Sequence, residues 1–160
     1  MNDHTLVFLL KGTKTILAMK KIGFGKGKWN GYGGKVEKGE TIKEAAVREL
    51  FEESKIQTSE EKLLPLGVIE FKFLQKPEYD QDVHIFILEE FGEAIETEEM
   101  KPNWFNIEKL PLTEMWDGDE HWIPIVLNKL TVKAKVEFLG EGKFEKIEFS
   151  EPLKKIIKRQ

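Results

Sequence analysis

Three glutamates, Glu49, Glu52 and Glu53, lie close together in the segment RELFEE. At ~100° per residue on an α-helix, they fall within an arc of about 100° and so share one face. Carboxylates at these spacings repel one another by about 0.2–0.5 kcal/mol per pair. A sequence keeps such a cluster most readily when a cation neutralises it, and oxygen ligands favour Mg²⁺, with Mn²⁺ as the alternative. A bare E-x-x-E-E pattern is more often a solvated acidic face, so the neighbouring residues must decide between the two.

These glutamates belong to a segment, residues 41–54, that is expected to be helical. Thr41 can cap the first turn, and Glu44 three residues later completes a capping box. The preceding stretch at residues 23–34 is rich in glycine, which predicts a loop whose backbone bends sharply or approaches something closely. The carboxylates would therefore lie on a capped helix that follows a glycine-rich loop.

Alternating or apolar segments predict the rest of the fold. A second helix is expected at residues 123–130, beginning near Asp119, and Gly140-Glu141-Gly142 is typical of a hairpin turn. Strands interleaved with two helices indicate a mixed α/β fold in one domain at residues 1–152. The basic residues 153–160 would form a solvated tail. The predicted strands are 5–10, 15–20, 68–74, 83–88, 132–139 and 144–149.

The spacing around the three glutamates resembles the Nudix box, whose family form is G-x5-E-x7-R-E-U-x-E-E-x-G-U, with U aliphatic. Here the pattern begins at Gly34 and includes Glu40 and Arg48 before the glutamate cluster. This resemblance to the Nudix hydrolases implies a Nudix fold, a mixed β-sheet sandwiched between helices, with the C-terminal β-hairpin added. Lys55 replaces the second glycine of the box, so we expect a different or strained end to the helix.

The resemblance also implies a site where a divalent cation, Mg²⁺ or Mn²⁺, is held against a pyrophosphate group. Such ions neutralise charge on the bridging oxygens and lower the pKa of a bound water. Arg48 would orient the glutamates through a salt bridge, with Glu40 in a similar supporting role. Glu99 would bind metal or help to activate water. The implied metal ligands are Gly33 (through its carbonyl), Glu49, Glu52, Glu53 and Glu99, and the implied catalytic residues are Arg48, Glu49, Glu52, Glu53 and Glu99.

Within the Nudix hydrolases, the chain resembles the oxidised-purine nucleoside triphosphatases of the MutT homolog 1 group. The similarity covers residues 5–151 and is most specific at 19–36, 99–105 and 115–116. It implies hydrolysis of purine nucleoside triphosphates such as 8-oxo-dGTP and 2-hydroxy-dATP to the monophosphate and pyrophosphate. This activity would sanitise the nucleotide pool and prevent DNA damage. The implied substrate-binding residues are Thr5, Lys20, Phe24, Asn30, Tyr32, Gly33, Gly34, Lys35, Phe71, Trp116, Asp117 and Asp119.

Several of these residue types suit a purine base. A flat ring can stack on Trp116, with Phe24 and Phe71 closing the pocket. Asn30 offers both a donor and an acceptor to the edge of the base, and the carboxylate of Asp119 can accept from its N–H groups. An aromatic residue taken alone more often belongs to the hydrophobic core. The prediction of a base-binding pocket therefore rests on the combination of these residues within the matched segments.

The chain departs from this group at the end of the pocket sequence. The group has two adjacent aspartates after Trp-Pro, whereas this chain reads Trp116-Asp117-Gly118-Asp119. Two adjacent carboxyls can share a proton and recognise bases with different donor patterns, so losing one would narrow the bases accepted, unless Asp117 restores the pair. Gln81, in place of a methionine, makes the pocket wall more polar. Alternatives are therefore another modified purine nucleotide or a dinucleoside polyphosphate as substrate, or a non-catalytic nucleotide-binding module, which the intact glutamates oppose.

Composition excludes several other classes of protein. The net charge of −4 argues against a nucleic-acid polymer as partner, because general nucleic-acid binders are usually basic. The absence of cysteine excludes disulfides, thiolate zinc sites and cysteine nucleophiles. The apolar run after Met1–His4 is too short for a signal peptide or a membrane span. We therefore expect a cytoplasmic monomer without a membrane partner.

Overall fold

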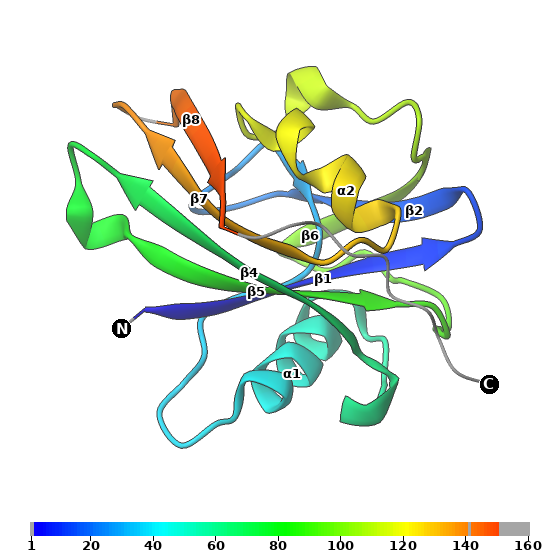
Figure 1. Cartoon of the computed structure of the whole chain (residues 1–160). Coiled ribbons are helices and arrows are strands. Elements are labelled where there is room, and N and C mark those ends of the chain that lie inside the picture. The colour runs from blue at the N-terminus through cyan, green and yellow to red at the C-terminus, as the bar shows by residue number, and fades with distance from the viewer. Residues whose placement is uncertain (1, 141, 151–160) are drawn as a thin grey trace.

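One mixed β-sheet runs through the chain, and a helix lies on each of its faces (Figure 1). The computed structural model describes residues 2–140 and 142–150. The main helices are α1 (Ile42–Ser54) and α2 (Ile123–Leu127), and single 3₁₀ turns form η1 (Glu60–Lys62), η2 (Pro77–Tyr79), η3 (Leu112–Glu114) and η4 (Asp119–His121). The strands are β1 (Asp3–Lys11), β2 (Lys14–Lys20), β3 (Trp29–Asn30), β4 (Leu64–Phe73), β5 (Gln81–Leu88), β6 (Met100–Asn106), β7 (Val132–Phe138) and β8 (Phe144–Phe149).

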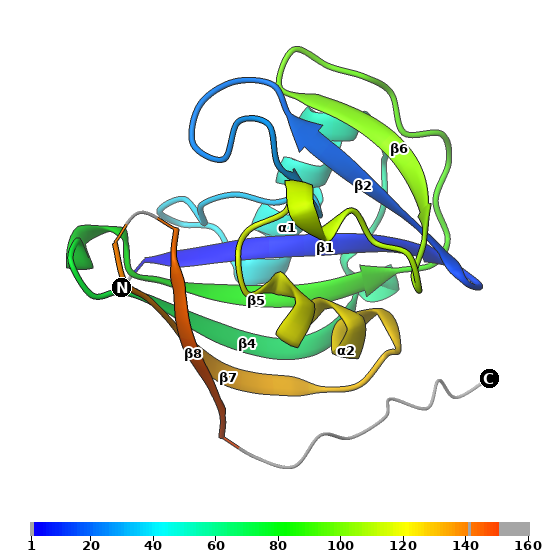
Figure 2. The ribbon, with the colours of Figure 1, turned by 90° about the horizontal axis from the view of Figure 1, so that it is seen from above.

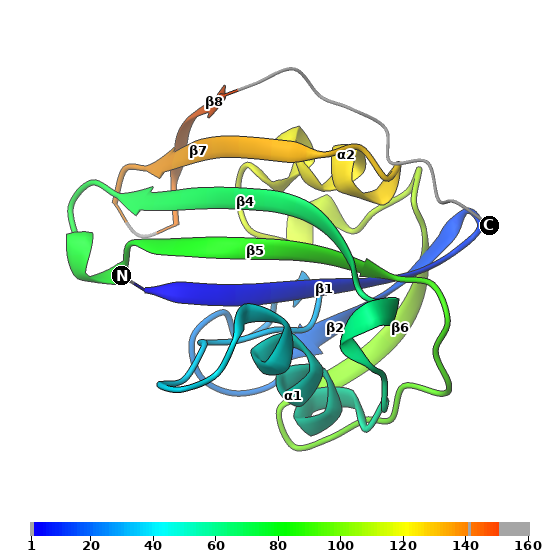
Figure 3. The ribbon, with the colours of Figure 1, turned by 60° about the horizontal axis from the view of Figure 1, so that its bottom comes forward.

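The strand order is β3-β2-β1-β5-β4-β7-β8, and β6 pairs separately with β2. The pairs β1–β5 and β4–β7 are parallel, whereas the other pairs are antiparallel. Figure 3 shows β1, β5, β4 and β7 side by side, with α1 across one face. Seen from above, β2 and β6 run together away from this central group (Figure 2). The predicted mixed sheet between helices, with a C-terminal β7–β8 hairpin, is confirmed.

Side-chain alternation along β1 divides the core between the two faces of the sheet. Leu6, Phe8 and Leu10 contribute to a cluster that includes α2, whereas Val7 and Leu9 contribute to a cluster that includes α1. Successive residues of a strand point to opposite faces, so a strand whose residues are all apolar must be covered on both sides. The two helices therefore cover opposite faces of one central sheet. Each turns apolar side chains toward that sheet, so the polar residues of α1 lie on its other sides.

Helix α1 begins and ends with identifiable caps. The Thr41 hydroxyl accepts the N–H of Glu44 at 3.1 Å, and the Glu44 carboxylate accepts the N–H of Thr41 at 2.8 Å, which completes the predicted capping box. At the other end Lys55 takes a left-handed conformation with φ 65°, and its N–H donates to the Phe51 carbonyl at 2.8 Å. A non-glycine residue in this region carries strain, so the predicted strained helix end is confirmed.

The structure differs from the sequence prediction mainly in its irregular segments. Strand β6 was not predicted, because its residues show no regular alternation and include Pro102. Strand β3 has only two residues, too few to give a pattern. The second helix is shorter than predicted at both ends: η4 is separate from α2, and a left-handed turn at Lys129, with φ 59°, follows α2. Strand β4 begins at Leu64, before the predicted residue 68.

Some sequence predictions fall outside the described residues. These are the hairpin residue Glu141, the domain boundary at residue 152 and the basic tail at residues 153–160. Within residues 2–140 and 142–150, no helix is both long and apolar enough to cross a membrane.

Candidate active site

The loop before α1 is pressed between β1 and the helix. The Thr5 N–H donates to the Gly34 carbonyl at 2.9 Å, which ties the loop to β1. A Cβ atom at Gly33 would overlap the Thr5 carbonyl, and one at Gly34 would overlap the Glu49 carboxylate. At Gly33, where the obstacle is backbone, only glycine allows this approach, whereas at Gly34 a larger residue would displace the Glu49 carboxylate. The backbone of the loop is thereby brought directly against the carboxylates of α1.

Arg48 is the centre of a network of ion pairs on α1. Its Nε donates to Glu40 at 2.6 Å, and its Nη2 donates to the second oxygen of Glu40 at 2.9 Å. Its Nη1 donates to Glu49 at 2.6 Å and lies 3.4 Å from Glu52. Hydrogen bonds from Arg48 lower the pKa of Glu40 to about 2. This geometry agrees with the prediction that Arg48 orients the glutamates and that Glu40 supports it.

Glu53 differs from its neighbours because it is buried, with 3% of its surface exposed. Its carboxylate accepts the N–H of Gly33 at 3.0 Å. Burial raises the pKa of Glu53 to about 8, the Glu49 charge adds to this, and Lys20 opposes it. Burial also raises the pKa of Glu49, and the charges of Glu52 and Glu99 add to that shift. Burial and the nearby negative charges therefore both disfavour the ionised forms of Glu49 and Glu53.

The oxygens of these carboxylates are the donor type that a divalent cation prefers, although in the described residues the side chains are not yet grouped around one metal position. Within residues 2–140 and 142–150, no three acidic, histidine or cysteine side chains are grouped as metal ligands. Glu49 and Glu52 are instead paired with Arg48, and Glu53 accepts from Gly33. The donors are all oxygens, and burial together with neighbouring negative charge raises the pKa of Glu49 and Glu53, an effect that a hard cation such as Mg²⁺ would oppose.

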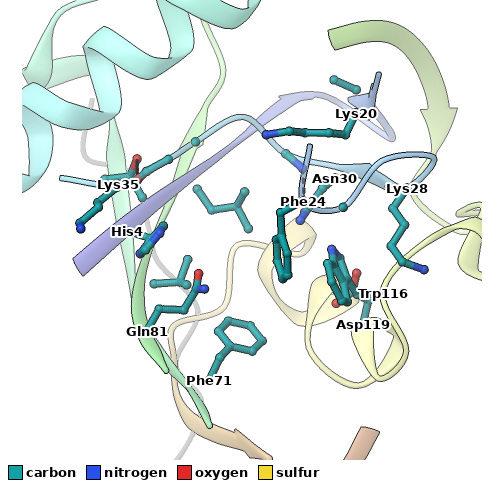
Figure 4. A pocket seen from close by; sticks show the side chains of 18 of the residues that line it. His4, Lys20, Phe24, Lys28, Asn30, Lys35, Phe71, Gln81, Trp116 and Asp119 are labelled. Carbon is teal, nitrogen blue, oxygen red and sulfur yellow. Dashed lines mark hydrogen bonds between the residues drawn. The ribbon is translucent and has the colours of Figure 1, made fainter. Parts of the chain in front are cut away.

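A cavity of about 330 Å³ opens beside α1 (Figure 4). Its volume is within the range of roughly 300–1,000 Å³ typical of small-molecule sites. Lys20 lies on one side, and His4 and Lys35 lie on another, whereas Trp116 and Asp119 come from a loop on the far side (Figure 4). The predicted residues that line the cavity are Thr5, Lys20, Phe24, Asn30, Gly33, Gly34, Lys35, Phe71, Gln81, Trp116 and Asp119.

The far side of the cavity is aromatic. The rings of Phe24 and Trp116 are 5.1 Å apart, and Tyr79 stacks on the outer side of Phe24 at 5.9 Å. Lys28 Nζ lies 5.3 Å from the centre of the Trp116 ring. Phe24 remains 59% exposed, so it borders the mouth of the cavity and not its floor. A flat, apolar ligand can therefore find stacking partners here.

Asp119 is the polar exception in this aromatic surrounding. Only 3% of its surface is exposed, and within the described residues its Oδ2 atom has no hydrogen-bond partner. Burial raises the pKa of Asp119 to about 8, and hydrogen bonds from Trp116 and Trp122 oppose the shift. Buried polar atoms in native proteins are nearly always paired, so an unpaired one in a cavity indicates a place for a ligand's polar group.

Asp117 and Gly118 hold the Asp119 loop against the β7–β8 hairpin. The exposed Asp117 carboxylate accepts the N–H of Phe144 at 3.0 Å, and Asp117 does not line the cavity. Gly118 has φ 94°, and a Cβ atom there would overlap the Phe144 ring. His121 stacks on the same ring at 4.8 Å. The structure therefore places Asp117 outside the cavity, contrary to its predicted role in substrate binding, because the hairpin backbone occupies its carboxylate.

Tyr32 is likewise placed away from the cavity. It is fully buried in the core cluster that contains α1, and within the described residues its hydroxyl has no hydrogen-bond partner. Backbone hydrogen bonds with Val7 on both sides fix its position, at 2.6 and 2.9 Å. Because neighbouring residues of an extended segment face opposite ways, the segment that exposes Gly31 and Gly33 to the cavity turns Tyr32 into the core. Its predicted role in substrate binding is therefore wrong in this structure.

The sequence analysis missed several residues that line the cavity. Phe73 lies two residues after Phe71 on β4, so strand alternation could have indicated it. Lys28 was passed over because the glycine-rich loop has no periodicity from which a direction can be predicted. Trp122 and Phe138 come from separate elements, and no local pattern relates them to the loop.

Comparison with known proteins places this geometry in context. The family model of the NUDIX domain matches residues 2–125. The chain is 46% identical over 142 residues to the oxidized purine nucleoside triphosphate hydrolase of Danio rerio, which covers 88% of this chain and 85% of that protein. It is 43% identical over 143 residues to the Mus musculus protein of the same name, with coverages of 89% and 86%.

Solved structures share the fold. A MutT protein from Bacillus halodurans superposes with a TM-score of 0.77 at 23% identity, covering 95% of this chain and 100% of that one. A MutT NUDIX hydrolase from Burkholderia pseudomallei gives a TM-score of 0.61 at 22% identity, with coverages of 69% and 86%. The predicted fold class is therefore confirmed.

Proposed function

The chain belongs to the NUDIX family, and on that premise we propose that it hydrolyses oxidised purine nucleoside triphosphates, such as 8-oxo-dGTP and 2-hydroxy-dATP, to the monophosphate and pyrophosphate. One observation carries the proposal: an aromatic cavity beside the acidic helix contains the buried carboxyl of Asp119, whose Oδ2 atom has no hydrogen-bond partner among the described residues. Two relatives with 43% and 46% identity carry the name of this activity and align with most of the chain.

At the base end, the cavity offers stacking and a small set of polar groups. The rings of Trp116 and Phe24 lie 5.1 Å apart and contact each other, so together they would offer one aromatic surface on which a face of the purine stacks. The Asp119 carboxyl, whose pKa is raised to about 8, is largely protonated at neutral pH, so it can donate through one oxygen and accept through the other. Asn30 lines the same cavity and adds a further amide. These groups can recognise the donor and acceptor pattern that oxidation changes on a purine.

At the phosphate end, Lys20 and Lys35 line the cavity and would contact the phosphate oxygens. Glu49, Glu52, Glu53 and Glu99, with the Gly33 carbonyl, would hold Mg²⁺, which when bound neutralises phosphate charge and lowers the pKa of a water. Mn²⁺ would fit the same oxygen donors. Arg48 keeps Glu49 and Glu52 on the substrate side of α1, and Gly33 holds Glu53 beside the loop. The water would attack a phosphorus of the triphosphate, and pyrophosphate would leave.

The biological role that follows is removal of damaged purine triphosphates before a polymerase uses them. We propose that the protein does this in the cytoplasm as a monomer. Its partner would be the nucleotide alone, because the net charge of −4 gives no general attraction to a nucleic-acid polymer.

A second candidate within the same reaction class is supported by the polar wall of the cavity. Gln81 and His4 line it together, and Gly118 provides no carboxylate beside Asp119. A methylated purine triphosphate or a dinucleoside polyphosphate would then be the preferred substrate. Hydrolysis of 8-oxo-dGTP would in that case be incidental.

Pyrophosphate release with Mg²⁺ tests the proposal directly. The panel contains 8-oxo-dGTP, 2-hydroxy-dATP, O6-methyl-dGTP, dGTP, dATP and a dinucleoside polyphosphate, for which the nucleotide products are quantified. We expect kcat/KM for the oxidised purines to exceed that for dGTP and dATP by about tenfold or more, which is ~1.4 kcal/mol of discrimination. Equal rates would overturn the proposal, and a preference for O6-methyl-dGTP or the dinucleotide would favour the second candidate.

A further inference from the structure

Residues 95–100 lead into β6 and lie against the end of α1. This segment carries Glu99, whereas Glu53 lies in the last turn of α1. The two acidic residues thus come from different elements, and the contacts of the segment decide how they are placed relative to each other. Those contacts form two sets, one toward α1 and one toward β2.

Toward α1, the segment supplies hydrogen-bond donors to carbonyls at the helix end. The Thr97 hydroxyl donates to the Glu53 carbonyl at 3.0 Å, and the Ile95 N–H donates to the Ser54 carbonyl at 2.9 Å. The last carbonyls of a helix have no partner within the helix, so they need such donors. The same Thr97 hydroxyl accepts the Met100 N–H at 3.3 Å, and the Thr97 N–H donates to the Met100 carbonyl at 2.9 Å. Thr97 therefore fixes both the helix end and the turn that contains Glu99.

Toward β2, the segment is held by Lys21. The Lys21 N–H donates to the Glu99 carbonyl at 2.7 Å. Its Nζ atom donates to the Thr97 carbonyl and to the Glu96 carboxylate, both at 2.8 Å. The carbonyls of Thr97 and Glu99, on either side of Glu98, are thus both hydrogen-bonded to Lys21. Glu99 itself is exposed, so its side chain is not held by burial.

We propose that Thr97 and Lys21 are positioning residues that hold the Glu99 segment at a fixed place relative to Glu53. The inference rests on the proposed function, in which carboxylates from both elements bind one divalent cation. Mg²⁺ demands near-octahedral geometry at about 2.0–2.1 Å, so a ligand on an untethered segment would have to be ordered at each binding event. Thr97 and Lys21 would order the Glu99 segment in advance, without contacting the metal or the substrate.

A matched pair of substitutions at Thr97 tests the inference. Thr97→Val keeps the shape and removes the hydroxyl, whereas Thr97→Ser keeps the hydroxyl. Thr58→Val is the control, because within the described residues the buried Thr58 hydroxyl has no partner to lose. Lys21→Met removes the two Nζ contacts of the second set and keeps the backbone hydrogen bond to the Glu99 carbonyl. Mn²⁺ binding is measured by the loss of the free-ion electron paramagnetic resonance signal, with thermal unfolding as the check of folding.

We expect Thr97→Val to weaken Mn²⁺ binding about tenfold, within the range of roughly 10–100-fold typical of residues that orient metal ligands. Thr97→Ser and Thr58→Val should bind as the wild type does, and Lys21→Met should be weakened in the same direction. The Mg²⁺ concentration for half-maximal hydrolysis should rise in parallel, with the preference among bases unchanged. Wild-type Mn²⁺ affinity in Thr97→Val would overturn the inference. Failure of the proposed substrate would instead show as a changed base preference in the wild type, with the Mn²⁺ results intact.

Discussion

The aromatic base end of the cavity and the glutamates of α1 are prepared to different degrees. These glutamates lie beside the cavity without lining it, and they form the proposed phosphate end. At the base end, Asp119 Oδ2 has no hydrogen-bond partner in the part of the chain that the structure describes, and the rings of Phe24 and Trp116 pack together, so both features are in place before a ligand binds. At the phosphate end, Glu49 is committed to Arg48, and Glu53 is buried against Gly33. On the proposed function, a purine would therefore enter a formed site, whereas the triphosphate would meet carboxylates that must first rearrange around a cation.

The physical cause of this difference is charge. One neutral carboxyl can be kept in an apolar pocket, because burial itself raises its pKa and removes the charge. Several carboxylates on one helix face repel one another, and they need a countercharge to coexist. Arg48 provides it through its contacts with Glu40, Glu49 and Glu52. The glutamates of the proposed phosphate end are thus held by the Arg48 cation, and a bound metal ion would take over part of that role.

The largest expected effect comes from removing a charge at the phosphate end. Glu53→Gln should lower kcat by about 10³-fold or more, ~4 kcal/mol, because an amide cannot replace a carboxylate as a metal ligand and charge acceptor. Stability without metal should not fall, since the variant would no longer bury an acid and the new amide carbonyl could still accept the N–H of Gly33. Steady-state kinetics and thermal unfolding in EDTA measure the two quantities.

Nucleotide binding to the Glu53→Gln variant tests whether the base end binds independently of the phosphate end. Because the base end is preformed, the affinity for 8-oxo-dGMP should stay within about threefold of the wild type, less than ~0.7 kcal/mol. A fully active Glu53→Gln variant would refute the metal assignment. Loss of monophosphate binding would instead mean that the two ends are coupled.

The next effect should come from the base end. Asp119→Ala should lower kcat/KM for 8-oxo-dGTP about 10–100-fold, because the polar edge of the base loses its buried partner. Mn²⁺ affinity should remain unchanged. If 8-oxo-dGTP hydrolysis is barely affected, Asp119 does not read this base, and the second candidate substrate class gains support.

Sequence patterns indicate the helix that carries the glutamates more directly than they indicate the set of residues that meet around the cavity. The spacing of Arg48, Glu49 and Glu53 is set by one helix, so local sequence already contains the geometry. The base end combines β1, β4, the glycine-rich loop and the η4 loop, and their meeting depends on tertiary packing. Asp117 was therefore assigned to the cavity, although a backbone N–H of the distant hairpin binds it. Tyr32 was misassigned because the glycine-rich loop gives no indication of which residues turn inward.

The contact between Gly118 and Phe144 tests whether the base end depends on the hairpin. Gly118→Ala should lower the free energy of unfolding by about 2–4 kcal/mol, from backbone strain at φ 94° together with overlap of the Phe144 ring. Gly12→Ala is the control for strain alone, because Gly12 has φ 60° and open space around its Cα. Chemical denaturation measures both.

Gly118→Ala should also raise KM for 8-oxo-dGTP while leaving Mn²⁺ affinity unchanged, because the strain falls on the loop that carries Trp116 and Asp119. Equal destabilisation by Gly118→Ala and Gly12→Ala would show that the Phe144 ring yields without cost. The hairpin would then not constrain the base end.

A pH dependence of stability is expected from Asp119, and comparison with Asp119→Asn separates it from that of Glu53, whose pKa burial also raises to about 8. The pKa of Asp119 rises from an ordinary value of 3.8 to about 8 on folding, chiefly through burial. Between these values the folded state binds a proton that the unfolded state has lost, so stability falls as pH rises. One proton gives a slope of up to about 1.4 kcal/mol per pH unit. In EDTA, the difference in unfolding free energy between the wild type and Asp119→Asn should therefore shift against the wild type from pH 5 to pH 8. The same shift should persist in Mg²⁺, because the ion binds at the other end; a difference that does not vary with pH would mean that Asp119 stays ionised and hydrated in the folded protein.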